Sequence, residues 1–325
     1  MKASAVAPLF ALVAAVAACS SDLPRSSLVE GVRILATSAD LPYARPGESV
    51  SLRVLAADGR ADRSRPMRLF WLPAPCVNPP GDDYFGCYPA FATTFAPGVD
   101  LAPQLVAGDR WSFTMPADAI ASAAPHPGAP DAYGVAFVFV LACAGHLEYV
   151  PVDASAQSPV TTPFGCFDDA HAALGPSDFV FAFTRVYAFA DRRNANPVID
   201  HLTFGGAPVD PAAGVALDHC TAADESSCAT TDLDAVVPDA SWELDPGTLD
   251  RSGAPGHEGL WVDYYATGGR FANDSVVLFD ATTGRASPTT DAYAAPLAPG
   301  PGTLWAVVHD TRGGASWIGV PLSAR

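Results

Sequence analysis

The sequence predicts an all-β protein built of two small β-sandwich domains with disulfide-stapled loop insertions. Three observations support this fold class. Short runs of apolar residues alternate with polar ones at the period of a β-strand. The 325 residues include 27 glycines and 31 prolines, which is above average usage, so turns are frequent and long helices are scarce. Six of the cysteines fall in three close pairs, each associated with a long segment between predicted strands.

The first half of the chain contains clear strand patterns. Residues 50–56 alternate between apolar and polar side chains, which indicates a strand with one buried face. Residues 135–142 are apolar throughout, as expected of a strand buried on both faces. Residues 179–190 form a long last strand, and the polar stretch 192–196 then ends the pattern. Further strands are predicted at 32–36, 67–72 and 111–115.

The second half repeats this organisation. Strands are predicted at 197–199, 259–265 and 275–279, and residues 304–320 form a closing hairpin around a Gly-Gly turn. One short helix is predicted at 168–174, with Asp168 as its N-cap and Gly175 at its end.

Domain lengths support two sandwiches with insertions. We predict a first domain at 28–191, a linker at 192–196 and a second domain at 197–325. The first is too long for a bare sandwich of about 100 residues. Each domain approaches or falls below that size once its cysteine-bearing segments are set aside, at 73–107, 144–177 and 210–256.

Several short segments resemble bacterial immunoglobulin-like domains. PGESVSL at 46–52 looks like an early strand of such domains, and FTMPAD at 113–118 looks like a later strand and turn. YYATGG at 264–269 and WAVVHD at 305–310 are similar to the closing half of these domains in uncharacterised bacterial surface lipoproteins. The resemblance implies two immunoglobulin-like β-sandwiches and implies no activity, because such folds carry many functions.

The N-terminus has the pattern of an export signal. Lys2 is followed by fourteen mostly apolar residues, which are too few to span a membrane. The sequence Val-Ala-Ala-Cys at 16–19 resembles the lipobox of bacterial prolipoproteins. This resemblance implies a signal peptide at 1–18, a lipid on Cys19, a tether at 19–27 and attachment to a membrane. In well-studied lipoproteins an aspartate directly after the cysteine retains the protein at the inner membrane. This chain has Ser20 there, which favours attachment to the outer membrane.

Assigning Cys19 to lipid leaves six cysteines, and their spacing favours three local disulfides in an oxidising compartment. A metal site is the alternative, with His219, Cys220 and Cys228, or His146 with Cys143, as ligands. No C-x-x-C pair occurs, so we assign no metal and no cofactor. The predicted pairs are Cys76 with Cys87, Cys143 with Cys166, and Cys220 with Cys228.

The net charge excludes two classes of partner. The chain has 18 basic and 35 acidic residues and a formal charge of −17. Nucleic-acid binding depends on a basic face, and so does electrostatic attachment to anionic lipid. We therefore expect no nucleic-acid partner, and membrane contact through the lipid on Cys19 alone.

Catalytic motifs are absent from the sequence. There is no G-x-S-x-G, no phosphate-binding loop and no G-x-G-x-x-G. His257-Glu258 begins like a zinc-protease motif, but position 261 is Trp. Asp310-Thr311-Arg312-Gly313 departs from the Asp-Thr-Gly of aspartic proteases. We expect a non-enzymatic protein, with a secreted-side hydrolase as the alternative.

The stapled loop at 73–107 is the best candidate for binding. Asp82 and Asp83 supply oxygen atoms that suit calcium, and Tyr84 and Phe85 supply aromatic faces that suit a glycan. Turn formation and packing are the structural alternative for these residues. The expected function is a structural or extracellular binding role in the cell envelope, with an unknown protein or glycan partner. A calcium-dependent glycan-binding module is a narrower alternative.

Overall fold

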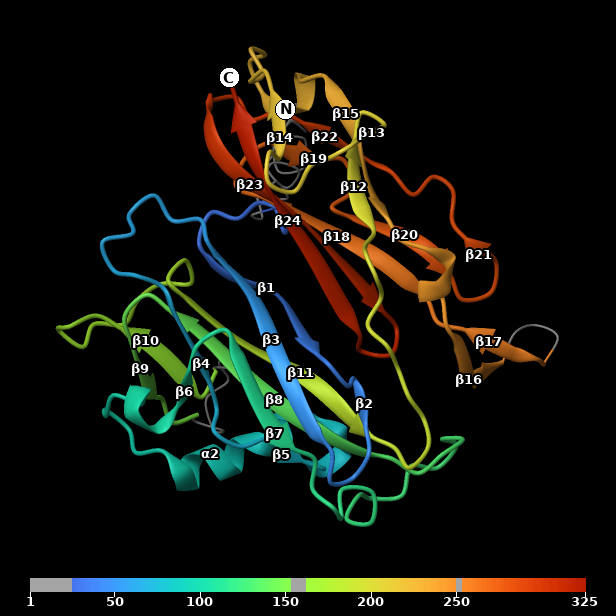
Figure 1. The fold of residues 1–325 in the computed structure, drawn as a ribbon. Coiled ribbons are helices and arrows are strands. Elements are labelled where there is room, and N and C mark those ends of the chain that lie inside the picture. Colours follow the sequence, from blue (N-terminus) through green and yellow to red (C-terminus); the bar gives the residue numbers. More distant parts are fainter. Residues whose placement is uncertain (1–24, 153–161, 250–252) are drawn as a thin grey trace, which may run out of the picture.

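The computed structural model describes residues 25–152, 162–249 and 253–325. The predicted signal peptide, Cys19 and most of the tether lie outside these residues. The chain is all-β, as the sequence predicts, and folds into two β-sandwiches that lie side by side (Figure 1).

The first sandwich pairs a three-stranded sheet with a six-stranded sheet. The order of the smaller sheet is β1-β3-β7, and that of the larger is β2-β11-β8-β4-β6, with β5 also paired to β8. A separate two-stranded sheet joins β9 and β10. The strands are β1 (Val32–Ala39), β2 (Tyr43–Ala44), β3 (Ser49–Asp58), β4 (Arg68–Trp71), β5 (Cys76–Val77), β6 (Val106–Ala107), β7 (Arg110–Thr114), β8 (Gly134–Cys143), β9 (His146–Tyr149), β10 (Phe164–Phe167) and β11 (Phe179–Ala188).

Strand β8 is buried on both faces, as its apolar sequence predicts. Val138 and its neighbours on one face pack against the three-stranded sheet. Phe137, Phe139 and Leu141 on the other face pack against the insertion at 73–107. The first domain therefore has three layers, because the insertion covers the outer face of the larger sheet.

That insertion contains most of the helical structure described in the first domain. Its elements are η2 (Pro80–Asp82), η3 (Tyr84–Cys87), α2 (Tyr88–Thr94) and η4 (Ala102–Gln104). Phe91 and Phe95 pack among the buried side chains over β8, together with Leu101. Among the described residues, no helix combines the length and hydrophobicity that crossing a membrane requires.

The second sandwich pairs a five-stranded sheet with a six-stranded sheet around one apolar core. The sheet orders are β13-β12-β15-β22-β19 and β14-β24-β23-β18-β20-β21, and β16 and β17 form a separate hairpin. The elements are β12 (His201–Phe204), β13 (Ala207–Pro208), β14 (Val215–Leu217), η5 (Glu225–Ser227), β15 (Thr230–Val236), η6 (Asp239–Ser241), β16 (Leu244–Leu249), β17 (Pro255–His257), β18 (Leu260–Ala266), β19 (Arg270–Phe271), β20 (Ser275–Asp280), β21 (Gly284–Arg285), β22 (Asp291–Ala294), β23 (Gly300–Asp310) and β24 (Ala315–Ala324).

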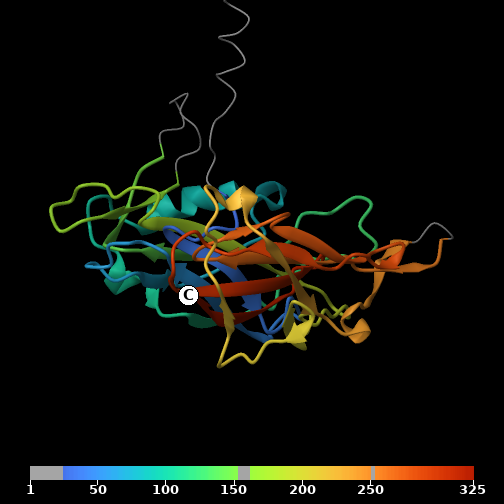
Figure 2. The same cartoon turned by 90° about the horizontal axis from the view of Figure 1, so that it is seen from above.

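The two sandwiches contact each other directly, because β1 of the first packs against β24 of the second. Val29 and Leu35 form a small apolar cluster that also includes Trp305 of β23. The guanidinium of Arg53 lies 4.5 Å from the ring centre of Trp317 on β24. The β16–β17 hairpin projects away at one end of the molecule (Figure 1, Figure 2).

Two local predictions are wrong. Residues 168–174 form no helix, because the Asp168 carboxylate accepts the backbone N–H groups of Ala170 and Ala172 and closes a tight turn instead. The strand predicted at 197–199 is absent as well, and β12 begins only at His201. The described end of the predicted tether, residues 25–27, contacts the second sandwich. The Ser27 carbonyl accepts the N–H of Ala266 at 2.9 Å, so this segment is docked on the second sandwich.

Candidate functional site

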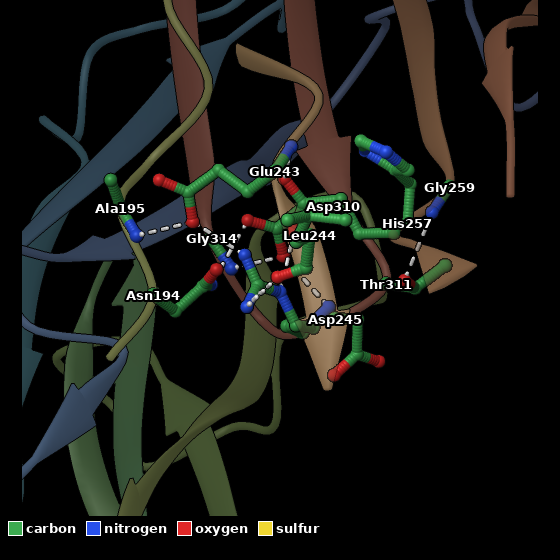
Figure 3. Close-up of polar contacts among 12 residues, drawn as sticks. Asn194, Ala195, Glu243, Leu244, Asp245, His257, Gly259, Asp310, Thr311 and Gly314 are labelled. Carbon is green, nitrogen blue, oxygen red and sulfur yellow. Dashed lines mark hydrogen bonds and ion pairs between the residues drawn. The ribbon is translucent and has the colours of Figure 1, made fainter. Parts of the chain in front are cut away.

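The two segments that partly match catalytic motifs, His257-Glu258 and 310–313, lie together beside the linker. Glu258 follows β17, and Arg312 lies in the turn between β23 and β24. The Arg312 Nε–H donates to Glu258 Oε2 at 2.6 Å, and its Nη2 donates to the carboxylate of Glu243. We call Arg312, Glu243, Glu258, Asp310 and Asn194 the Arg312 cluster. Figure 3 shows Glu243, Asp310 and Asn194 converging on this turn.

The hairpin turn itself is built around the Asp310 carboxylate. Its oxygens accept the backbone N–H groups of Arg312 at 2.8 Å and Gly314 at 2.7 Å. They also accept the side-chain amide of Asn194 at 3.0 Å. A Cβ atom at position 314 would lie 2.2 Å from Asp310 Oδ2, so only glycine allows this close approach.

Burial dominates the electrostatics of the cluster. The side chains of Glu258 and Arg312 are 1% and 4% exposed. Burial raises the pKa of Glu258 to about 7, although the hydrogen bond from Arg312 opposes this change. Burial also raises the pKa of Asp310 against its three hydrogen bonds. Since the guanidinium stays charged, Arg312 is the permanent counter-charge for these carboxylates.

The cluster binds the linker to the second sandwich. Besides the amide of Asn194, the N–H of Ala195 contacts Glu243 Oε2 at 3.4 Å. Asn196 extends the connection, because its Oδ1 accepts the N–H of Ala315 at 2.9 Å and its amide donates to the carbonyl of Ala39 at 2.7 Å. A single side chain therefore joins strands β1 and β24 of the two domains.

Aromatic and cationic side chains enclose the cluster. Tyr43 of the first sandwich lies beneath two guanidinium groups, with Arg192 at 5.6 Å and Arg312 at 5.9 Å from its ring centre. Burial raises the pKa of Tyr43 to about 12. The ring of Trp242 stacks on His257 at 3.7 Å and its Nε1–H donates to the Glu258 carbonyl at 2.7 Å.

The arrangement of the cluster is better suited to binding the linker and the turn than to transferring a proton to a ligand. Asp310 borders a groove of about 350 Å³ between the sandwiches, which residues of β1, β11 and β18 also line. Glu258 and Asp310 are only 2% and 3% exposed. Their carboxylates bind the guanidinium and the turn, and a strongly perturbed pKa is a known consequence of such structural networks as well as of catalytic sites.

The cysteines form the three disulfides that their spacing predicts. The pairs are Cys76–Cys87, Cys143–Cys166 and Cys220–Cys228. Both alternative metal sites are therefore wrong, because Cys143 and Cys220 are in disulfides and supply no thiolate ligand. Persistent disulfides form in oxidising compartments, which indicates an exported protein.

The predicted binding loop is folded against the first sandwich. The ring of Tyr84 stacks on Phe183 of β11 at 4.4 Å, and Phe85 remains 36% exposed. Asp83 caps η3 through the N–H of Phe85. Asp82 Oδ2 contacts His126 Nε2 at 2.7 Å and accepts the hydroxyl of Tyr133 at 3.0 Å. Tyr84 thus contributes to packing, and binding by this loop stays a prediction. Cys19 lies outside the described residues.

A second polar group was missed from the sequence. His146 Nε2 and His171 Nδ1 lie 2.8 and 2.7 Å from the same oxygen, Oε1 of Glu148. Burial opposes ionisation of Glu148, but the hydrogen bonds from the two imidazoles outweigh it and lower its pKa. His-x-Glu on one strand puts both side chains on the same face, a signal that the sequence contains.

Comparisons with known proteins leave the family open. No protein-family model matches the chain, and no curated protein matches it. Fibronectin(III)-like modules of Clostridium thermocellum CbhA are 9% identical, with 90% of this chain and 94% of that chain covered and a TM-score of 0.22. The tandem Ig repeats of Dlar are 9% identical over 91% and 98%, with a TM-score of 0.22. The C-terminal domain of the Streptococcus agalactiae AgI/II polypeptide BspA is 10% identical over 89% and 99%, with a TM-score of 0.17. These distant likenesses carry no argument about function.

Proposed function

We propose that this chain is a non-enzymatic lipoprotein of the bacterial cell envelope. It is exported, anchored through a lipid on Cys19, and held at the outer membrane. Its two sandwiches act as one rigid unit in a structural or extracellular binding role. The observation that supports this role best is the fixed linker. The Arg312 cluster binds it to the second sandwich, and Arg193 and Asn196 bind it to the first.

A rigid joint favours presentation of a surface. Contacts between domains within a chain commonly permit relative motion unless they are extensive. Here the linker is bound on both sides, because Arg193 also pairs with Glu48 of the first sandwich at 2.6 Å. A surface that does not move binds a partner with less loss of conformational entropy. The cluster therefore supports a binding or scaffolding role better than a hinge.

The docked N-terminal segment gives the anchored molecule an orientation. Arg25 pairs with Glu225 of η5 at 2.7 Å, so the described chain begins against the second sandwich. Five residues lie between Cys19 and Arg25, so the two Cα atoms are at most about 22 Å apart. The second sandwich would then lie next to the membrane. The first sandwich, with its stapled insertion, would be the part presented to partners.

Membrane fractionation tests the anchor. The wild-type protein should sediment with outer membranes and carry a diacylglyceryl group on Cys19 by mass spectrometry. Cys19→Ala should be released into the soluble fraction, whereas the matched Ser20→Ala control should stay bound. Retention of Cys19→Ala on membranes would overturn the anchor.

Turnover assays test the absence of catalysis. Purified protein should give no turnover with generic ester, peptide and glycoside substrates. Reproducible turnover that disappears in a single-residue variant would support the hydrolase alternative and contradict the proposed class.

A further inference from the structure

A His-Glu-His group lies on the first sandwich, away from the Arg312 cluster. His146 and Glu148 are on β9, and His171 is in the turn after β10. One potential ligand atom from each residue lies within 4.8 Å of the other two. The Glu148 side chain is 8% exposed, whereas that of His171 is 67% exposed. The group is thus anchored on the inside and open to solvent on one side.

Covalent and backbone restraints hold the three side chains in place. Strands β9 and β10 pair in antiparallel register, with His146 opposite Phe167. The Cys143–Cys166 disulfide joins the same two chain segments, three residues before His146 and one residue before Phe167. Neither segment can move away from the other without distorting this disulfide.

The backbone conformation of His171 is unusual, and its imidazole is directed toward Glu148. Its φ is +59°, in the left-handed region that a non-glycine residue adopts at a cost in free energy. The turn that imposes this conformation is closed by Asp168, whose carbonyl accepts the N–H of His171 at 3.0 Å. The strained residue is also the one that supplies the exposed imidazole to Glu148.

We propose that His146, Glu148 and His171 form a binding site for a divalent transition-metal cation of the Zn²⁺ class. Two imidazole nitrogens and one carboxylate oxygen form a donor set that such metals favour. The ligands would be Nε2 of His146, Nδ1 of His171 and Oε1 of Glu148. The exposed side at His171 leaves a fourth position for water or for a donor atom of a partner. This proposal goes beyond the proposed envelope role and does not depend on it.

The distances are compatible with metal entry. Ligand atoms about 2.0–2.1 Å from a tetrahedral zinc ion lie about 3.4 Å from one another. The two nitrogen–oxygen distances of 2.8 and 2.7 Å would therefore widen by well under 1 Å. Each imidazole would present a lone pair at the nitrogen that now faces Glu148. In the neutral ring the proton lies on the other nitrogen, so binding of the cation requires only this change of tautomer. The cation keeps its oxidation state.

Calorimetric titration of the oxidised, metal-free protein with ZnCl₂ tests the proposal, with Co²⁺ absorption as a second readout. We expect one ion per chain, and a melting temperature that rises with added Zn²⁺ and falls back with chelator. His171→Asn removes the imidazole but keeps a residue that tolerates positive φ. It should weaken binding by at least about 100-fold, because changes to supporting residues alone cost 10- to 100-fold. Glu148→Gln should also weaken binding.

The matched control is His201→Ala, which removes a histidine that pairs with Asp200 at 3.0 Å. This variant should bind Zn²⁺ like the wild type. Failure of the wild type to bind Zn²⁺ at about 100 μM would overturn the proposal. So would one-to-one binding that survives in both His171→Asn and Glu148→Gln. Because His171 is exposed, His171→Asn should fold even where Glu148→Gln does not.

Discussion

Replacing Arg312 with methionine tests whether the buried cluster holds the molecule together. Methionine keeps an unbranched apolar side chain but removes the counter-charge of Glu258. Removing one partner of a buried ion pair costs about 3–5 kcal/mol of unfolding free energy, because the other charge stays buried and unpaired. The 1% exposure of Glu258 places this pair in that class. Asp310 keeps its backbone partners and should contribute less to the loss.

The loss should depend on pH in a defined direction. The pKa of Glu258 is about 7 in the folded protein, against 4.5 ordinarily. In the variant, the guanidinium no longer favours the charged carboxylate, so this pKa rises further. At pH 8 the variant must bury a carboxylate charge or protonate it. At pH 5 the carboxyl is neutral in both proteins, so the destabilisation should be smaller.

Urea unfolding of the oxidised protein, followed by tryptophan fluorescence at pH 8 and pH 5, measures both effects. Arg65→Met is the matched control, because Arg65 is 45% exposed and lies 3.9 Å from Asp178. Its loss should cost less than about 1 kcal/mol at either pH. An Arg312→Met cost below about 1 kcal/mol at pH 8, or an equal cost at both pH values, would refute the reasoning.

Three further predictions concern Glu258, the Cys76–Cys87 disulfide and the aromatic residues of the insertion. Burial raises the folded-state pKa of Glu258 to about 7, so its contribution to stability is full below pH 4.5 and is lost as pH rises through 7. Glu258→Gln should remove this pH dependence of the unfolding free energy, which amounts to about 3 kcal/mol. Comparing the unfolding free energies of the two proteins across that pH range measures it. Replacing Cys76 and Cys87 with alanine should cost about 2–3 kcal/mol and make the insertion sensitive to protease, as peptide mapping would show. Tyr84→Ala should lower the melting temperature by several degrees, whereas Phe85→Ala, at a ring that packs on Tyr84 and Tyr88 but remains 36% exposed, should lower it less. Equal effects of the last two changes would contradict the packing described for the loop.

Local patterns in the sequence predicted the sheets and the cysteine pairs. A strand buried on both faces needs apolar residues at every position, and the run at 135–142 shows this directly as β8. Cysteines separated by 11, 23 and 8 residues meet across short loops, so their pairing depends little on the rest of the fold. The helix predicted at 168–174 failed because Asp168 can cap a turn as well as a helix.

Only the tertiary structure decided which polar residues meet. Glu243, Glu258 and Arg312 come from three separate loops of the second sandwich, and only the fold brings them into contact. His146 and Glu148 share a face by strand periodicity, which the sequence does contain. His171 joins them only because a turn with positive φ directs its ring back to β9. Period and spacing are local properties of the chain, whereas these clusters arise from contacts between distant segments.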